Sequence, residues 1–280
     1  MFLTGPKCLN GTKLHTKGDS VMNMIVCVKQ VMDPETPAAS FRIDPEAKRA
    51  ITSKDKGMVI SPFDENGVEG ALKLKDATGG KVSILSMGGK SCREVIKQCL
   101  AMGADEGFQL TDPAFDDFDA YATAANLAEA IKKIGEYDII FCGRQESDWD
   151  AGQVGSGIAE ILGIPSVTAI RRIEVSDGKA TVDRVLADGY ETIEVSMPLL
   201  VTASNEIGEP RYATLPKIMA AAKKPITVWD SGDITPAQAR SQMLSLFIPV
   251  REGECEFIES EDPEEAGAML ATKLREAKLI

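Results

Sequence analysis

Short apolar runs alternate with amphipathic segments along residues 24–143. The run 24–31 (MIVCVKQV) is typical of a buried parallel strand, and residues 64–80 carry apolar side chains at helical spacing before a Gly-Gly pair. The pattern then repeats, with strands predicted over 81–89, 107–112 and 137–143 and helices over 91–107 and 116–138. This alternation favours a Rossmann-like α/β fold, in which a mainly parallel sheet carries helices on both faces.

The pattern changes after residue 165, where apolar and polar residues alternate one by one. Two alternating runs meet at Asp177-Gly178, and a third run follows Asp188-Gly189. Because Asp-Gly pairs favour the tight turns of β-hairpins, this segment predicts an antiparallel ribbon that extends the sheet.

The C-terminal part of the chain is more polar. Residues 252–265 are acidic, and residues 264–279 have the spacing of an amphipathic helix. Such a segment would hardly form a core alone, so it packs either on a partner or back on its own domain, and the sequence leaves both open. We expect three parts, namely a disordered extension over residues 1–21, an α/β domain over residues 22–230 and a C-terminal arm over residues 231–280.

Charge and composition exclude several functions. The formal net charge is −12, from 31 Lys and Arg against 43 Asp and Glu, which repels nucleic acid. No apolar run is long enough to cross a bilayer, and six cysteines without a C-x-x-C pair indicate a reduced, cytoplasmic bacterial protein. The single histidine, His15, lies in the polar N-terminal stretch, so we expect neither histidine-based catalytic residues nor a metal site.

The segment over residues 143–157 is the main candidate for a functional site. A strand-like run ending at Cys142 leads into GRQESDWDAGQVGSG and then into a helix-like stretch. Backbone N–H groups and the positive end of a helix dipole at such a junction can hold phosphate groups. The alternative for Gly152, Gly155 and Gly157 is a tight turn without a ligand, and the neighbouring polar side chains of the loop favour binding. We expect the first strand and the strand ending at Cys142 to be neighbours at the switch point of the sheet.

Four segments of the chain resemble one family. These are CVKQV (27–31), SPFDENGVEGALKLK (61–75), GRQESDWDAGQVG (143–155) and VTASNEIGEPRYATLPKIMAAAKKPI (201–226). In order and spacing they are similar to the hallmark segments of the electron transfer flavoprotein β subunit. The resemblance covers residues 24–226, and its PRYATLP heptad is far more specific than a glycine motif.

The resemblance implies a heterodimer with an α subunit that carries the electron-transferring FAD on a mobile domain. The β subunit would bind AMP or a second FAD in its own site, and would be an electron carrier between an acyl-CoA or other flavin dehydrogenase and an acceptor. That acceptor would be a membrane quinone oxidoreductase, or ferredoxin and NAD. The implied nucleotide contacts are Cys27, Ser61, Pro62, Phe63, Asp64, Asn66, Gly143, Gln145, Asp148, Asp150, Ala151, Gln153, Val154 and Gly155.

The same resemblance implies a partner-recognition loop formed by Arg211, Tyr212, Leu215 and Pro216, whose leucine docks into a pocket of the dehydrogenase. A leucine bounded by prolines is a preorganised anchor, although a leucine in a loop more often belongs to a core. Lys223 and Lys224 are either rim charges for acidic partners or a solvated helix end.

Departures from the family pattern bear on the type of member. Trp149 stands where a small or acidic residue is usual, and Val154-Gly155 is more like the electron-bifurcating form with two FAD. Val185 replaces a glutamate that helps to hold the mobile domain in AMP-type members.

The alternatives to this family are an ATP-dependent ligase of the same fold or a free-standing ATP-binding module. The first would carry a Gly-rich loop directly after its first strand, and the second would be about half this length.

Overall fold

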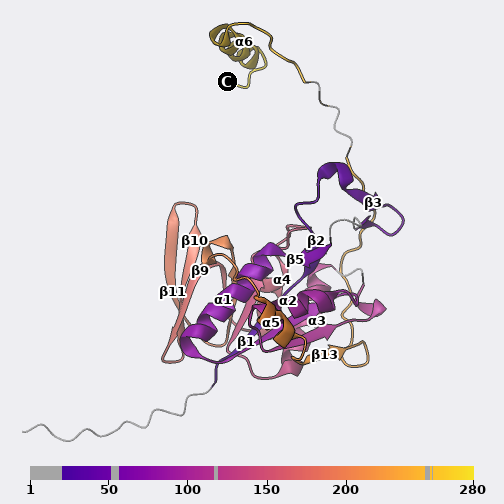
Figure 1. The fold of residues 1–280 in the computed structure, drawn as a ribbon, viewed down its shortest axis with the longest axis vertical. Coiled ribbons are helices and arrows are strands. Elements are labelled where there is room, and N and C mark those ends of the chain that lie inside the picture. The colour runs from indigo at the N-terminus through magenta and orange to yellow at the C-terminus, as the bar shows by residue number, and fades with distance from the viewer. Residues whose placement is uncertain (1–20, 52–56, 117–118, 250–252, 254) are drawn as a thin grey trace, which may run out of the picture. The chain divides into compact units, whose positions relative to one another are not determined.

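The computed structural model describes residues 21–51, 57–116, 119–249, 253 and 255–280 (Figure 1). Most of the expected N-terminal extension, His15 included, lies outside the described residues. The described chain forms two units, one of residues 21–42 with 50–244 and one of residues 43–49 with 245–280.

The first unit is built on a nine-stranded sheet with the order β11-β10-β9-β12-β8-β1-β6-β7-β13. Its strands are β1 (Asn23–Cys27), β6 (Lys81–Met87), β7 (Glu106–Leu110), β8 (Ile139–Gly143), β9 (Ser166–Ser176), β10 (Lys179–Leu186), β11 (Gly189–Ser196), β12 (Leu199–Ala203) and β13 (Ile226–Trp229). Strands β13, β7, β6, β1, β8, β12 and β9 pair in parallel, whereas β9, β10 and β11 form the antiparallel ribbon. The predicted mixed sheet is confirmed.

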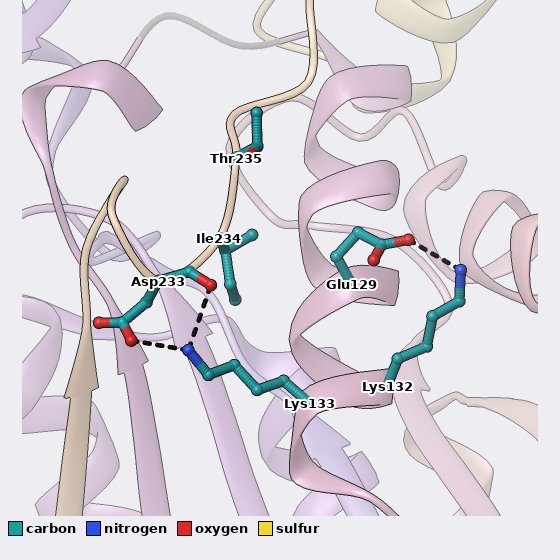
Figure 2. Close-up of a pocket in the computed structure, with 6 residues that line it drawn as sticks. All are labelled: Glu129, Lys132, Lys133, Asp233, Ile234 and Thr235. Atoms are coloured by element: carbon teal, nitrogen blue, oxygen red, sulfur yellow. Dashed lines mark hydrogen bonds and ion pairs between the residues drawn. The ribbon is translucent and has the colours of Figure 1, made fainter.

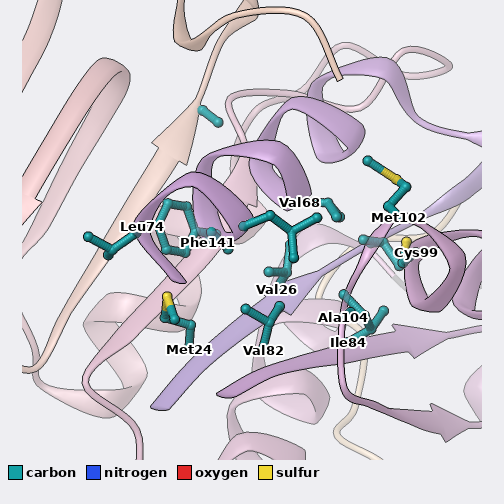
Figure 3. Close-up of a cluster of buried hydrophobic side chains, with 14 of the residues drawn as sticks. Met24, Val26, Val68, Leu74, Val82, Ile84, Cys99, Met102, Ala104 and Phe141 are labelled. Atoms are coloured by element: carbon teal, nitrogen blue, oxygen red, sulfur yellow. The ribbon is translucent and has the colours of Figure 1, made fainter. Parts of the chain in front are cut away.

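Helices cover both faces of this sheet (Figure 1). They are α1 (Pro62–Thr78), α2 (Cys92–Met102), α3 (Ala120–Ile134), α4 (Val154–Leu162) and α5 (Leu215–Ala221). Alternate residues of β1 point to opposite faces, so Met24 and Val26 pack with α1, α2 and α5. Figure 3 shows part of this core, in which Val68 of α1 lies over Val26. Ile25 and Cys27 pack with α3 and α4 on the other face. The predicted Rossmann-like α/β fold is confirmed.

Local sequence explains where several elements begin and end. Helix α3 begins where the Asp119 carboxylate accepts a hydrogen bond from the Ala122 N–H (2.8 Å). Gly79 and Gly135 end α1 and α3 with positive φ angles of 78° and 109°, which glycine adopts without strain. Asp177 and Gly178 also have positive φ and form the turn between β9 and β10.

The structure adds short elements that apolar periodicity did not predict. They are β2 (Gln30–Met32), β3 (Arg42–Asp44), β4 (Arg49–Ile51), β5 (Met58–Ile60) and 3-10 helices over Ala38–Ser40, Pro113–Phe115 and Asn205–Ile207. Strand β2 pairs with β5, and β3 pairs with β4. Three residues are too few to show a period, which explains why these elements were missed.

The second unit contains α6 (Pro263–Glu276), and this helix agrees with the one predicted over 264–279. Asp262 caps its first turn by accepting a hydrogen bond from the Glu264 N–H (3.0 Å). All its side chains are exposed or half-buried, including Met269 and Leu270.

Candidate nucleotide-binding site

The strand order places a switch point between β1 and β8. From β1 the chain runs through α1 to β6 on one side, and it returns through α3 to β8 on the other side. Strands β1 and β8 pair in parallel, with Met24 opposite Ile139 and Val26 opposite Phe141. The expectation that these strands are neighbours is confirmed. In open α/β sheets, ligands bind where the carboxyl ends of two such strands diverge.

Three segments meet at these carboxyl ends. They are residues 28–29 after β1, residues 61–64 at the start of α1 and residues 143–153 after β8. The Ser61 N–H donates to the Lys29 carbonyl (2.9 Å), and the Ser147 N–H donates to Ser61 Oγ (3.3 Å). Lys29 Nζ forms an ion pair with Asp148 Oδ1 (2.7 Å). The structure therefore brings the predicted contacts of the first three segments together, and we call this place the crevice.

Asp64 lies among these three segments with only 8% of its surface exposed. Its Oδ2 accepts a hydrogen bond from the Lys29 N–H (2.8 Å), and its Oδ1 accepts one from the Gly143 N–H (2.9 Å). Burial raises the pKa of this carboxyl to about 7, although both N–H groups and the Lys29 charge oppose the rise. Asp64 was predicted as a nucleotide contact, and here its carboxylate binds the backbone of the chain.

The loop after β8 folds around the side chain of Glu146, which the sequence analysis did not single out. Glu146 Oε1 accepts a hydrogen bond from the Ala151 N–H (3.4 Å), and Oε2 accepts one from the Gly152 N–H (3.2 Å). Asp150 and Gly152 have positive φ angles of 58° and 62°, and Gln145 donates to the Asp150 carboxylate. Successive N–H groups in such a turn form an anion-binding concavity, which the Glu146 carboxylate fills.

Gly155 and Gly157 lie inside α4 and not in the loop, so a tight turn is the wrong interpretation for both. A Cβ at position 155 would lie 2.9 Å from Thr202 Cγ2, and one at position 157 would lie 2.9 Å from Ala124 Cβ. These glycines therefore let α4 pack closely on β12 and α3. Only Gly152 has the turn conformation that was considered for all three.

Cys27, Asn66 and Cys142 have structural contacts. Cys27 and Cys142 are buried where β1 and β8 end, and the Cys27 thiol together with burial raises the pKa of Cys142. Asn66 Nδ2 donates to the Gly208 carbonyl (3.1 Å). The guanidinium of Arg144, another residue that the sequence analysis missed, lies 5.0 Å from the centre of the Phe63 ring. A cation over an aromatic ring is stabilised at this distance.

The crevice offers groups that fit an adenine nucleotide. Ser147 Oγ is buried and has no hydrogen-bond partner within the described part of the chain, so a ligand can satisfy it. Helix α4 begins at Val154 directly after the loop, which directs free N–H groups to this end of the sheet. Trp149 is 53% exposed and can stack on an aromatic ring.

The predicted recognition segment continues into a helix. Residues 210–214 are irregular, as expected, whereas Leu215 and Pro216 are the first residues of α5 and not part of a loop. Proline is favoured in the first turn of a helix, and this signal was overlooked. Tyr212 is 94% exposed and Leu215 is 71% exposed, so neither belongs to the core of the described chain.

Helix α1 holds the segment that leads to α5. Arg211 binds the carboxylate of Glu69 through its backbone N–H (3.0 Å), Nε (2.8 Å) and Nη2 (3.0 Å). Nη2 also lies 2.9 Å from the Asp76 carboxylate. One turn away, Lys73 Nζ donates to the Ile207 carbonyl (2.7 Å). Arg211 was predicted as a recognition residue, and the structure shows its guanidinium engaged with α1.

Lys224 is also engaged inside the chain. Its Nζ donates to the carbonyl of Leu100 (3.0 Å) and to that of Ala104, at the end of α2. Burial lowers the pKa of this amine. Lys224 is therefore not a solvated helix end, because its amine is partly buried against carbonyls near the end of α2, and its role as a rim charge for partners stays a prediction.

A depression of about 520 Å³ is lined by residues of α3 and of the segment 233–235, and Figure 2 shows these residues. Lys133 Nζ lies 2.7 Å from Asp233 Oδ1, and Lys132 Nζ lies 2.7 Å from Glu129 Oε1. Its cations are therefore already paired, and none of its lining residues belongs to the crevice.

The fold and the crevice define a Rossmann-like α/β protein with a switch point between β1 and β8, and comparison with known proteins gives its family. The sequence model of the electron transfer flavoprotein domain matches residues 49–234. The chain is 39% identical to subunit CarD of the caffeyl-CoA reductase-Etf complex of Acetobacterium woodii, over 92% of this chain and all of the relative. It is 38% identical to electron transfer flavoprotein subunit beta of Clostridium acetobutylicum, with the same coverage.

A third relative is the acryloyl-CoA reductase electron transfer subunit gamma of Anaerotignum propionicum. It is 40% identical over 75% of this chain and 78% of the relative. The chain therefore belongs to the electron transfer flavoprotein family, and the predicted family and its electron transfer function are confirmed. Within the described residues, no helix has the length and apolar character needed to span a membrane.

Proposed function

We propose that this chain is the β subunit of a heterodimeric electron transfer flavoprotein that carries electrons from a flavin dehydrogenase to a downstream acceptor. The observation that carries the proposal is the crevice, where three segments meet at the β1–β8 switch point. Family membership adds flavin chemistry to a site that the fold alone would assign only to a nucleotide.

The electron-transferring FAD would be held mainly by the α subunit, and the crevice would hold AMP or a second FAD. Residues 61–64 and 143–155 would bind the nucleotide, with Ser147 Oγ and the N–H groups at the start of α4 as polar contacts. Bound flavin supplies the redox chemistry, whereas this chain binds, orients and shields it. Trp149 and Val185 favour a second FAD over AMP.

Tyr212 and Leu215 would form the contact with a partner dehydrogenase, because they are large apolar side chains exposed beside a fixed backbone. The names of the relatives from Acetobacterium woodii and Anaerotignum propionicum favour acyl-CoA reductases as electron partners. The arm predicted over residues 231–280 would pack on the α subunit through residues 245–280, because residues 231–244 belong to the α/β unit. The acceptor would be a membrane quinone oxidoreductase, or ferredoxin and NAD, and this chain would lie in the cytoplasm.

The proposal is tested by the nucleotide content of the chain purified with its α subunit. Denaturation and chromatography should release either one FAD with one AMP or two FAD per heterodimer, and the native complex should show flavin absorption bands. ATP as the bound nucleotide, without flavin bands, would instead identify an ATP-binding enzyme or module of the same fold.

A further inference from the structure

We propose that Asp64 is a positioning residue whose ionised carboxylate assembles the crevice, so that acidification through neutral pH weakens nucleotide binding. This inference rests on the proposed nucleotide site at the ends of β1 and β8. Asp64 acts by binding the backbone N–H groups of Lys29 and Gly143, and not by contact with the nucleotide.

The carboxylate lies where the pairing of β1 with β8 ends. The last paired residues are Val26 and Phe141, and beyond them the two strands diverge. The N–H groups of Lys29 and Gly143 follow on the two diverging chains, and both donate to Asp64. One side chain thus replaces the interstrand hydrogen bonds at the point where a ligand enters.

Close packing shows how tightly this arrangement is built. A Cβ at position 143 would lie 2.5 Å from Asp64 Oδ1 and 2.8 Å from the Asp64 backbone nitrogen. Only glycine leaves room for the start of α1 to approach the end of β8 this closely. Asp64 also lies in the first turn of α1, where its N–H donates to the Ser61 carbonyl (2.9 Å). A shift of the carboxylate would therefore move Ser61, to which the loop after β8 is bonded.

Protonation changes what the carboxyl group can do. Ionised, it accepts from both N–H groups, whereas a protonated carboxyl places an O–H where one of these donors points. The pKa of about 7 puts this change within the ordinary pH range. The other titratable groups that influence Asp64, or are influenced by it, are Lys29 after β1, Glu146 after β8, Cys142 in β8 and Cys99 in α2.

The sign of the effect separates this role from simple charge repulsion. An anionic nucleotide beside an ionised carboxylate is repelled, so repulsion alone predicts tighter binding as the pH falls. A carboxylate that assembles the crevice predicts weaker binding as the pH falls. Lys29 and the two N–H groups stabilise the ionised carboxylate of Asp64 in part, and both N–H groups are bound to it at the strand ends, which favours weaker binding as the pH falls.

The test is calorimetric titration of AMP and FAD into the stripped heterodimer at pH 8, 7 and 6, with Asp64→Asn and Glu65→Gln variants. Glu65 is the next residue of the same helical turn, so its variant removes the same charge without touching the strand ends. For wild type and Glu65→Gln we expect about tenfold weaker binding at pH 6 than at pH 8. Asp64→Asn should bind about tenfold more weakly than wild type at pH 8 and lose the added pH dependence. The phosphate of AMP itself titrates near pH 6, which affects all three proteins alike.

A second measurement on the wild type keeps the inference testable if Asp64→Asn does not fold. In the full-length chain labelled with ¹⁵N at Lys and Gly, the amide signals of Lys29 and Gly143 should move together with one midpoint near pH 7. Different midpoints for the Lys29 and Gly143 amide signals would overturn the role of Asp64. So would an Asp64→Asn variant that binds AMP as tightly as wild type, or wild-type protein that binds nucleotide more tightly at pH 6 than at pH 8. If wild type binds neither AMP nor FAD at any pH, the proposed function itself fails.

Discussion

Glu69 of α1 is only 3% exposed, and its carboxylate receives three hydrogen bonds from Arg211, one from the backbone and two from the guanidinium. A buried carboxylate is tolerated when it is fully paired in this way. The pair fixes the chain just before Tyr212 and Leu215, so the start of α5 is presented by α1.

Replacing Arg211 with Ala should destabilise the fold by about 3 kcal/mol, because it leaves Glu69 buried without its partner. Asp76→Asn is the matched control, since Asp76 also binds Arg211 but 63% of its side chain is exposed, and it should cost less than about 0.5 kcal/mol. Urea unfolding monitored by circular dichroism measures both. Equal effects of the two variants would show that the buried contact with Glu69 has no special weight.

Leu215→Ala should leave the fold and the flavin content unchanged and should raise the KM for a partner acyl-CoA dehydrogenase about tenfold. The reason is that a docked leucine loses about 1–3 kcal/mol of apolar contact when it is truncated. Ile51→Ala removes another exposed aliphatic side chain of the chain and should change neither quantity. A lowered melting temperature with unchanged kinetics would instead give Leu215 a structural role.

Gly155→Val should destabilise the fold by about 1–3 kcal/mol even without a nucleotide, since the added side chain meets Thr202 and Cys142. Gly189→Val is the control, because a Cβ there meets no atom within 4 Å in the described chain, and it should be close to neutral. Thermal unfolding of the stripped protein distinguishes the two variants.

Asp64 should also give the stability of the fold a characteristic pH dependence. Its pKa rises from 3.8 to about 7 on folding, so this group stabilises the fold fully below pH 4 and loses that contribution as the pH rises through 7. Asp64→Asn cannot titrate at this position and so does not lose stability in this way as the pH rises. The free energy of unfolding of the variant minus that of wild type should therefore increase by up to about 1.4 kcal/mol per pH unit between pH 4 and 7. Urea unfolding across this range measures the difference, and a constant difference would contradict the titration.

Truncation after Leu244 should abolish co-purification with the α subunit and preserve the circular dichroism spectrum of the α/β domain. The cut at residue 231 that the sequence suggests would also remove contacts within the domain. Asp233 binds Lys133, the Ala237 N–H donates to Asn126 (2.8 Å), and Ser241 binds Asp119. Continued pairing at nanomolar affinity would place the interface elsewhere. The exposed Phe247 and Ile248, together with α6, are the expected contacts.

Much of the fold could be predicted from apolar periodicity and glycine stops. The long elements α1, α2, α3 and β8 and the Asp-Gly ribbon lie where the pattern places them, because their periods extend over several turns or strand positions. Strand β13 was not recognised as separate, and β12 was not distinguished from the ribbon, because a strand of four or five residues carries little period.

The candidate site could be located from the sequence, but the roles of its side chains could not. The meeting of residues 61–64 with 143–153 follows from strand order and the motif positions. That Asp64 binds two backbone N–H groups, and that Glu146 fills the turn at Gly152, depends on tertiary distances that no local pattern encodes. Arg211 was likewise predicted to contact the partner dehydrogenase. In the structure its guanidinium donates to the buried carboxylate of Glu69, which lies 142 residues away in the chain.

The position of β12 has a consequence for folding during synthesis. This strand lies between β8 and β9, although residues 199–203 follow both of them and the ribbon in the chain. One edge of β8 therefore stays unpaired until about 60 further residues have been made, which takes on the order of 3–12 s at usual rates of elongation. An apolar strand edge left open for seconds is a site for wrong pairing between nascent chains. Slower growth or lower temperature during expression changes the time between the synthesis of β8 and the synthesis of β12. The yield of folded protein should therefore depend on the rate of translation through residues 143–203.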